Sequence, residues 1–99
     1  MMRRVILAES DYVLEYCPYD SKVEYVLEDR TRVDCLTDAH AVEFDWCHKW
    51  AQAVGQALYY ARSTGRMPVV VLICKPGEER FARRARVAAP DIEVMVIPK

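Results

Sequence analysis

The chain has 99 residues, of which 53% are hydrophobic and only three are glycine, so it carries enough apolar material for one packed core. Its longest wholly apolar run, residues 69–74, is far shorter than the roughly 20 residues of a membrane-spanning helix. The formal net charge is −1, which by itself argues against a generic nucleic-acid binder. These features predict one globular domain over residues 1–99, with no membrane partner.

Charge is distributed unevenly along the chain. Up to Ala61 there are 11 acidic and 6 basic residues, whereas from Arg62 onward there are 4 acidic and 8 basic residues. The first part is therefore acidic and the last part basic. A partner that is sensitive to charge would meet two different surfaces.

The cysteines and the N-terminus bear on the cellular compartment. The four cysteines lie in apolar or regular stretches without the close spacing of a zinc site, which predicts buried free thiols. Residues 1–8 resemble the start of a signal peptide, but the acidic Glu9 and Asp11 interrupt the apolar stretch. We therefore expect a cytoplasmic protein.

The first half of the chain predicts one helix and three strands. Residues 7–17 have the apolar spacing of a short helix that ends before Pro18. Residues 22–27 alternate, with Val23, Tyr25 and Leu27 on one face, and the polar residues 28–31 form a turn. Residues 32–36 and 39–45 continue the pattern, so three antiparallel strands are expected to follow one another as a meander.

The second half predicts an α/β arrangement with a mixed sheet. From residue 46 to 61 the apolar residues recur at steps of three and four, typical of an amphipathic helix that packs on a sheet; they are Trp46, Trp50, Ala53, Val54, Ala57, Leu58 and Ala61. The apolar run 69–74 predicts a central strand covered on both faces. A helix over 78–87 and a strand over 92–97 complete a strand–helix–strand unit, which predicts a parallel pair.

Three carboxylates are predicted to meet on one face of the sheet. Glu43 and Asp45 are two residues apart in a strand and share a face, and the hairpin partner places Asp34 beside them. Converging carboxylates repel unless a cation lies between them, and all-oxygen ligation suits Mg²⁺ or Mn²⁺. Such a site suits phosphoryl chemistry. The competing interpretation is a solvated sheet face.

The following helix adds a polar stripe. Lys49, Gln52, Gln56 and Tyr60 are spaced by three, four and four residues. Lys49 can aim its ammonium group at the carboxylates, where it would orient a water or balance charge on a phosphate. The glutamines and the tyrosine offer contacts to a nucleic-acid backbone, and the competing interpretation is an ordinary helix flank.

Basic residues and histidines are further candidates. The predicted helix over 78–87 carries four arginines that either follow a phosphate backbone or form a solvated face; they are Arg80, Arg83, Arg84 and Arg86. His40 and His48 flank the carboxylates, but no matching set of ligands accompanies them. We expect both histidines to be packing or surface residues.

The order of these features resembles a known family. Asp34 on the second strand, Glu43 on the third, and then Gln56-Ala57-Leu58-Tyr59-Tyr60 on a helix resemble the PD-(D/E)xK nucleases, in particular their RecB-like and Holliday-junction-resolvase-like branches. The stretch TRVDCLTDAHAVEFDWCHKWAQAVGQALYYARSTG is similar to small bacterial and phage members, and the resemblance covers about residues 24–73. It implies a restriction-endonuclease-like fold and Mg²⁺ or Mn²⁺ bound by Asp34 and Glu43. It also implies a lysine that assists the attacking water, and an acid of the first helix, Glu9 or Glu15.

One position departs from the family pattern. The lysine of the family stands two residues after the second acid, but Asp45 occupies that position. In some members an acid there binds metal or acts as a base, and in others the lysine has moved to the following helix, as Lys49 would fit. A third alternative is an inactive module that retains the fold and binds nucleic acid or a protein.

The sequence hypothesis is therefore a divalent-metal-dependent DNA endonuclease. Its expected catalytic residues are Asp34, Glu43, Asp45 and Lys49, the first three of which also bind the metal. Its expected substrate-binding residues are Gln52, Gln56, Tyr60, Arg83 and Arg84. A chain of this length has no separate domain to read a sequence, so we expect recognition by DNA structure or backbone charge. A homodimer is also expected, because cutting both strands of DNA requires two active sites. A plain structural subunit of a larger complex is the remaining alternative.

Overall fold

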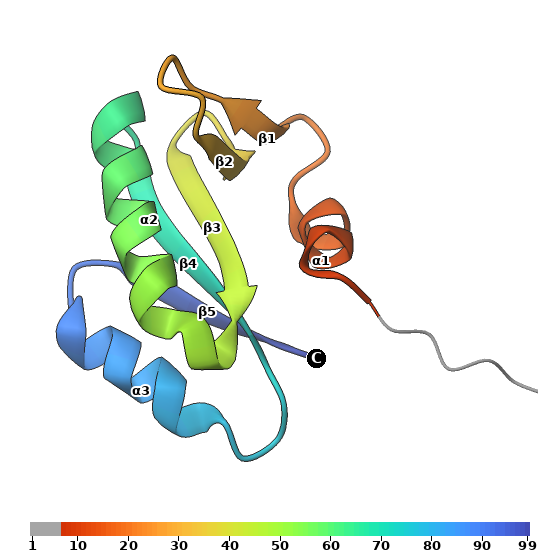
Figure 1. Cartoon of the computed structure of the whole chain (residues 1–99), viewed down its shortest axis with the longest axis vertical. Helices are drawn as coiled ribbons and strands as arrows, with labels where there is room; N and C mark the ends of the chain where they lie inside the picture. The colour runs from red at the N-terminus through yellow and green to blue at the C-terminus, as the bar shows by residue number, and fades with distance from the viewer. Residues whose placement is uncertain (1–6) are drawn as a thin grey trace, which may run out of the picture.

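Five strands, in the same order in the sheet as in the chain, lie between helices on both faces (Figure 1). The computed structural model describes residues 7–99. The elements are α1 (Glu9–Tyr16), β1 (Lys22–Val26), β2 (Arg32–Leu36), β3 (His40–Trp46), the short 3-10 helix η1 (Cys47–Lys49), α2 (Trp50–Thr64), β4 (Met67–Cys74), α3 (Glu79–Ala88) and β5 (Glu93–Pro98). Strands β1 to β3 are antiparallel, and β3, β4 and β5 are parallel. The predicted α/β class with a mixed sheet is confirmed.

The junction between β3 and α2 differs from the prediction of one helix over residues 46–61. Trp46 still pairs with Ile73 in the parallel ladder, so β3 extends through Trp46. The chain then turns through η1 and starts α2 at Trp50. Helix α2 ends at Thr64, where Gly65 takes a left-handed φ of 70° and donates its N–H to the Ala61 carbonyl. Lys49 therefore lies in η1, just before α2, rather than one turn inside α2.

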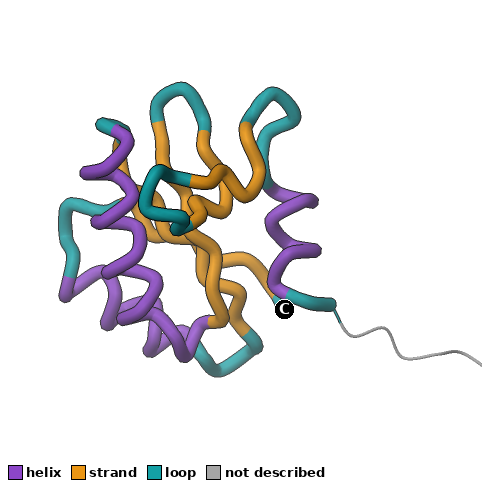
Figure 2. The backbone as a smooth tube through the Cα atoms, turned by 45° about the horizontal axis from the view of Figure 1, so that its top comes forward, coloured by secondary structure: helices purple, strands orange, loops and turns teal. Residues whose placement is uncertain are grey.

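Strand β4 is the centre of two apolar layers. Val70 and Leu72 pack with α2 and α3, while Val69, Val71 and Ile73 pack with Tyr12 and Val13 of α1. Figure 2 shows the sheet between the α2 and α3 pair on one side and α1 on the other. The predicted burial of residues 69–74 on both faces is confirmed. Because side chains alternate along a strand, this arrangement directs Glu43 and Asp45 of β3 towards α2.

The apolar stripe of α2 differs from the prediction at two positions. Leu58 is half exposed, whereas Tyr60, which was expected in the polar stripe, is 6% exposed. The Tyr60 ring packs with Val33, Leu36 and Ala41, and its hydroxyl lies near the polar residues Thr31 and Arg32. A tyrosine can fill an apolar position when its hydroxyl reaches a polar partner.

The prediction of free thiols is wrong. Disulfides join Cys17 to Cys35 and Cys47 to Cys74, and no free cysteine remains. The pairs are 18 and 27 residues apart in the sequence, so their proximity is produced by the fold. Cys47 follows Trp46, and Trp46 pairs with Ile73, so the parallel register of β3 and β4 brings Cys47 beside Cys74. Because Cys47 is in η1 and Cys74 is the last residue of β4, the second disulfide attaches η1, which includes Lys49, to the end of β4.

The described residues bear on the expectation about membranes but only marginally on the one about the N-terminus. None of the helices within residues 7–99 combines the length and the apolarity that crossing a bilayer requires. The signal-like start of the chain lies mostly in residues 1–6, outside the described residues.

Candidate functional site

A pocket of about 330 Å³ brings together the acidic and polar residues on the α2 side of the sheet. Its walls come from α1, from the β1–β3 meander, from η1 and from α2. The lining residues are Glu9, Glu24, Arg30, Thr31, Arg32, Asp34, Glu43, Asp45, Lys49, Gln52, Gln56 and Tyr60. All four expected catalytic residues and the three expected substrate-binding residues of α2 therefore line one cavity.

Asp34 and Glu43 each accept a hydrogen bond from the backbone of the strand that carries the other. The backbone N–H of Asp34 donates to Glu43 Oε1 at 3.0 Å, and the backbone N–H of Phe44 donates to Asp34 Oδ2 at 2.9 Å. The backbone pairing of β2 with β3 includes Cys35 with Val42 and Leu36 with Ala41 and does not extend to Asp34 and Glu43. The two carboxylates thus replace backbone carbonyls as acceptors, and the hairpin holds both at fixed positions.

The neighbouring strand is interrupted at the same level. In the β1–β2 register Val23 pairs with Cys35 and Tyr25 pairs with Val33, so Glu24 lies opposite Asp34 without being paired to it. Glu24 has a φ of 51°, in the left-handed region that a residue with a side chain rarely adopts. Its carboxylate lies 4.0 Å from the Arg32 guanidinium, and both residues line the pocket. The sheet is therefore irregular on both sides of Asp34.

Burial makes the Asp34 and Glu43 pair electrostatically costly. Glu43 is 3% exposed, and burial raises its pKa to about 9, with the nearby Asp34 carboxylate contributing to the rise. Burial also raises the pKa of Asp34, although the Phe44 N–H opposes the change. Two acids in one buried place cannot both ionise cheaply, so the pair retains a proton on Glu43 near neutral pH.

Asp45 and Glu9 form a second acidic pair across the pocket. Burial raises the pKa of Asp45, while the Trp46 N–H, which donates to Asp45 Oδ1 at 2.9 Å, and the positive charge of Lys49 lower it. Burial raises the pKa of Glu9 to about 7, with Asp45 and Asp34 adding to the rise. Glu9 and Asp45 both line the pocket, so their negative charges act on each other there. Of the two helix acids that the family resemblance implied, Glu9 lines the pocket and Glu15 is exposed.

The basic and polar wall of the pocket comes from η1 and α2. Lys49 is exposed and acts electrostatically on both Asp45 and Glu9. Gln52 is exposed and Gln56 half-buried, so both amides can reach a molecule that enters the pocket. Burial raises the pKa of Tyr60, with the Glu43 carboxylate adding to the rise, so its hydroxyl remains a donor. Tyr60 supports the hairpin that carries Thr31 and Arg32.

The donor set suits a hard divalent cation in its chemistry. Carboxylate oxygens are the ligands that Mg²⁺ and Mn²⁺ prefer, and a cation among these acids would offset the repulsion that raises their pKa values. Within residues 7–99 no group of three His, Cys, Asp or Glu side chains is already arranged to hold a metal ion. Asp34, Glu43 and Asp45 all bond backbone N–H groups instead.

The other sequence candidates lie elsewhere. Arg83 and Arg84 are on α3 and line a separate hollow with Trp50. His48 is exposed, and His40 is half-buried at the start of β3 in an apolar hollow on the α1 side of the sheet. Glu24 and Arg32 are pocket residues that the sequence analysis did not single out. The hairpin register would have identified Glu24, because it places this residue opposite Asp34.

Comparisons of the chain with protein-family models, with curated proteins and with solved structures find no match.

Proposed function

We propose that this chain is a divalent-metal-dependent endonuclease of the PD-(D/E)xK type, with a restriction-endonuclease-like fold, that hydrolyses DNA phosphodiester bonds. The observation that carries the proposal is the joint placement of Asp34, Glu43 and Asp45 with Lys49 in one pocket. The order helix, antiparallel meander, helix and parallel strand around that pocket supports it.

Three acids would hold the ion in this proposal. Asp34 and Glu43 are fixed by reciprocal hydrogen bonds across the hairpin, and Asp45 lies on the same face of β3 as Glu43. A bound Mg²⁺ or Mn²⁺ supplies a Lewis acid that polarises the phosphate and stabilises developing negative charge. Binding of the ion requires Glu43 to release the proton that burial retains, so we expect metal affinity to rise with pH.

The remaining pocket residues bind and orient the substrate. Lys49 places a positive charge beside the acids, where it balances charge on the phosphate that is attacked. Gln52 and Gln56 offer amide N–H donors to the adjoining sugar–phosphate backbone. Tyr60 supports the strands that carry the acids by packing with Val33, Leu36 and Ala41.

A DNA-nicking assay tests the proposal. The full chain is incubated with supercoiled plasmid and with branched DNA in Mg²⁺, in Mn²⁺ and in EDTA. We expect cleavage with either metal and a loss of about 100-fold or more in Asp34→Asn and in Glu43→Gln, since even groups that only support metal ligands typically contribute 10- to 100-fold. The matched controls are Asp38→Asn and Glu93→Gln, whose side chains are exposed outside the pocket. Full activity in Glu43→Gln would exclude the proposed site.

The second candidate is a binding module that does not cleave. It is favoured by Asp45 at the lysine position and by the absence, within the described residues, of a ready three-ligand group. A melting-temperature titration with Mg²⁺ separates the two candidates. We expect the ion to raise the melting temperature of the wild type and not that of Glu43→Gln, because a ligand of the folded state stabilises by mass action.

A further inference from the structure

Three arginines form an exposed basic surface on α3. Arg80, Arg83 and Arg84 are three and four residues apart, so they share one side of the helix. All three are exposed, and with Val87 and Trp50 they line an open hollow of about 660 Å³. We call these five residues the α3 surface.

The charges of the α3 surface are not neutralised within the protein. The one ion pair within residues 7–99 joins Arg32 to Glu24, far along the chain from α3. Glu79 is at the start of the same helix, and its pKa is lowered by backbone N–H groups and, to a smaller extent, by Arg83 and Arg80. It forms no salt bridge with either arginine, so the surface carries a net positive charge.

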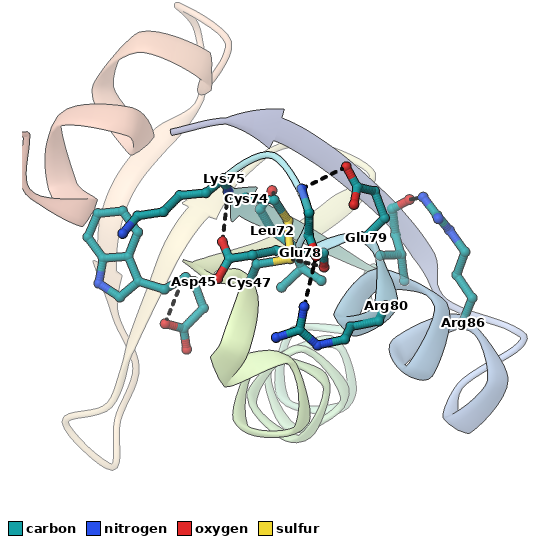
Figure 3. The surroundings of a disulfide bond; sticks show 12 residues. Asp45, Cys47, Leu72, Cys74, Lys75, Glu78, Glu79, Arg80 and Arg86 are labelled. Atoms are coloured by element: carbon teal, nitrogen blue, oxygen red, sulfur yellow. Dashed lines mark hydrogen bonds between the residues drawn. A yellow bond between two sulfur atoms is a disulfide. The ribbon is translucent and has the colours of Figure 1, made fainter.

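The guanidinium groups of Arg80 and Arg84 are held in place by neighbouring atoms. Arg80 donates to the Gly77 carbonyl at 2.8 Å (Figure 3), and its guanidinium lies 4.3 Å from the centre of the Phe81 ring. Arg84 covers the same ring at 5.4 Å. Arg86 differs, because it donates to the Val94 carbonyl and serves the contact between α3 and β5. Restrained guanidinium groups with free donors lose less entropy when they bind an anion.

The α3 surface adjoins the carboxylate pocket across the start of α2. Trp50 lines the α3 hollow, while the preceding residue, Lys49, lines the carboxylate pocket. Figure 1 shows α2 and α3 side by side on the same face of the sheet. A long anion that places one phosphate beside Lys49 can therefore continue past Trp50 to the arginines.

The α3 surface offers exposed guanidinium groups but no exposed aromatic ring, which favours duplex over single-stranded DNA as the partner. Proteins that bind single strands offer exposed aromatic rings on which bases stack. Here Trp50 is half-buried against the core, and the Phe81 ring is covered by Arg80 and Arg84. Exposed guanidinium groups without an open ring suit the phosphates of a duplex, which carries one charge about every 1.7 Å of its axis.

We infer that the α3 surface binds the backbone of duplex DNA beyond the step that is cleaved, with Arg83 and Arg84 as phosphate contacts. The inference rests on the proposed function for its location beside the pocket. Its chemistry is independent of cleavage, because the charges and their exposure require no metal. It makes recognition insensitive to base sequence, since phosphate contacts carry no direct sequence information.

Equilibrium binding of a short fluorescent duplex to the full chain tests the inference. Anisotropy is measured in EDTA, where no cleavage is required, over a series of salt concentrations. The test variant is Arg83→Gln/Arg84→Gln. The matched control is Arg62→Gln/Lys75→Gln, which removes the same charge from exposed positions outside the α3 hollow. Melting temperatures establish that both variants are folded.

We expect the test variant to bind on the order of 10-fold more weakly near 0.1 M salt, and the salt slope to fall by about 1.8, which is about 0.9 for each lost phosphate contact. The control should retain the wild-type slope. Equal slopes in the two variants, or no binding by the wild type, would overturn the inference. Equally tight binding of single-stranded DNA or of poly-glutamate, with the same loss in the test variant, would overturn the assignment to a duplex. Loss of cleavage alone would affect only the proposed function.

Discussion

The two sides of α2 carry opposite charges and differ in burial: the acids on one side are buried, and the arginines on the other are exposed. On the meander side, Glu43 and Asp45 are 3% and 4% exposed, and their pKa values are raised mainly by burial. On the α3 side, Arg80, Arg83 and Arg84 are exposed and have no carboxylate partner within 4.0 Å among residues 7–99. The acids therefore reduce the stability of the folded chain, whereas the arginines are largely screened by solvent.

This difference indicates which side requires a ligand. Buried acids that repel one another persist in a fold when they serve a bound cation or a reaction, so a perturbed pocket is a candidate for function. Exposed arginines cost little whether or not anything binds them, so their role has to be tested by binding.

The largest expected effect is on cleavage by Lys49→Ala. Removal of the ammonium group beside Asp45 and Glu9 should lower the cleavage rate about 100-fold, the lower end of what is lost when one group that stabilises developing charge is removed. Lys75→Ala, at an exposed position outside the pocket, is the control and should retain its rate.

The double variant Asp45→Lys/Lys49→Ala separates the two readings of position 45. It should recover part of the activity if the lysine of the family has moved to position 49, since it restores a lysine two residues after Glu43. It should remain inactive and fail to bind metal if Asp45 is a ligand. Cleavage rates and metal-dependent melting distinguish these results.

The second effect is on the pH dependence of stability without metal. Glu43 has its pKa raised from 4.5 to about 9, so between these values the folded chain holds a proton that the unfolded chain releases. Its contribution to stability is complete below pH 4.5 and is lost as the pH rises towards 9. From pH 5 to 8 in EDTA, the melting temperature of the wild type should therefore fall relative to that of Glu43→Gln, by at least about 4 °C, which is about 1 kcal/mol for a domain of this size. If the melting temperatures of the wild type and of Glu43→Gln changed equally with pH, the raised pKa of Glu43 would be contradicted. The control Glu93→Gln should show the same pH dependence as the wild type.

The smallest effect is on backbone strain near the pocket. Glu24 and Arg30 have positive φ values of 51° and 72°. Glycine adopts this region freely, so Glu24→Gly and Arg30→Gly should each stabilise the chain by roughly 0.5–1 kcal/mol, measured by denaturant unfolding. Only Glu24→Gly also removes a charge that raises the pKa of Asp34, so only this variant should shift the pH profile of cleavage. Equal pH profiles in both variants would indicate that Glu24 has no electrostatic role.

The meander and its acids were predictable from local patterns. Alternation in residues 22–27, 32–36 and 39–45 set the strands, and a short connection fixes the register of a hairpin. The structure accordingly places Asp34 and Glu43 side by side. The polar stripe of the following helix was predictable in part, since helical spacing brings Gln52 and Gln56 of α2 to the pocket, while Lys49 reaches the pocket from η1.

Features that depend on tertiary packing were not predictable. The disulfide of Cys47 with Cys74 follows from the parallel register of β3 with β4, which no local pattern specifies. Helical spacing predicts that Leu58 is buried and Tyr60 exposed, but the reverse is observed, because the Tyr60 ring packs with Val33, Leu36 and Ala41 of the meander. The separation of Arg83 and Arg84 from the pocket depends on where α3 packs beside α2.

The agreement between strand order in the sheet and strand order in the chain has a consequence for folding. Asp34 and Glu43 are nine residues apart and meet when one hairpin closes, whereas His40 meets Met67 only after α2 has formed and the chain has returned. Local contacts form sooner than distant ones because less loop entropy is lost. The repelling acids should therefore meet before η1 and α2 bring Lys49 beside them. We expect refolding to be faster in mildly acidic solution, where protonated carboxyl groups let the hairpin close without opposition.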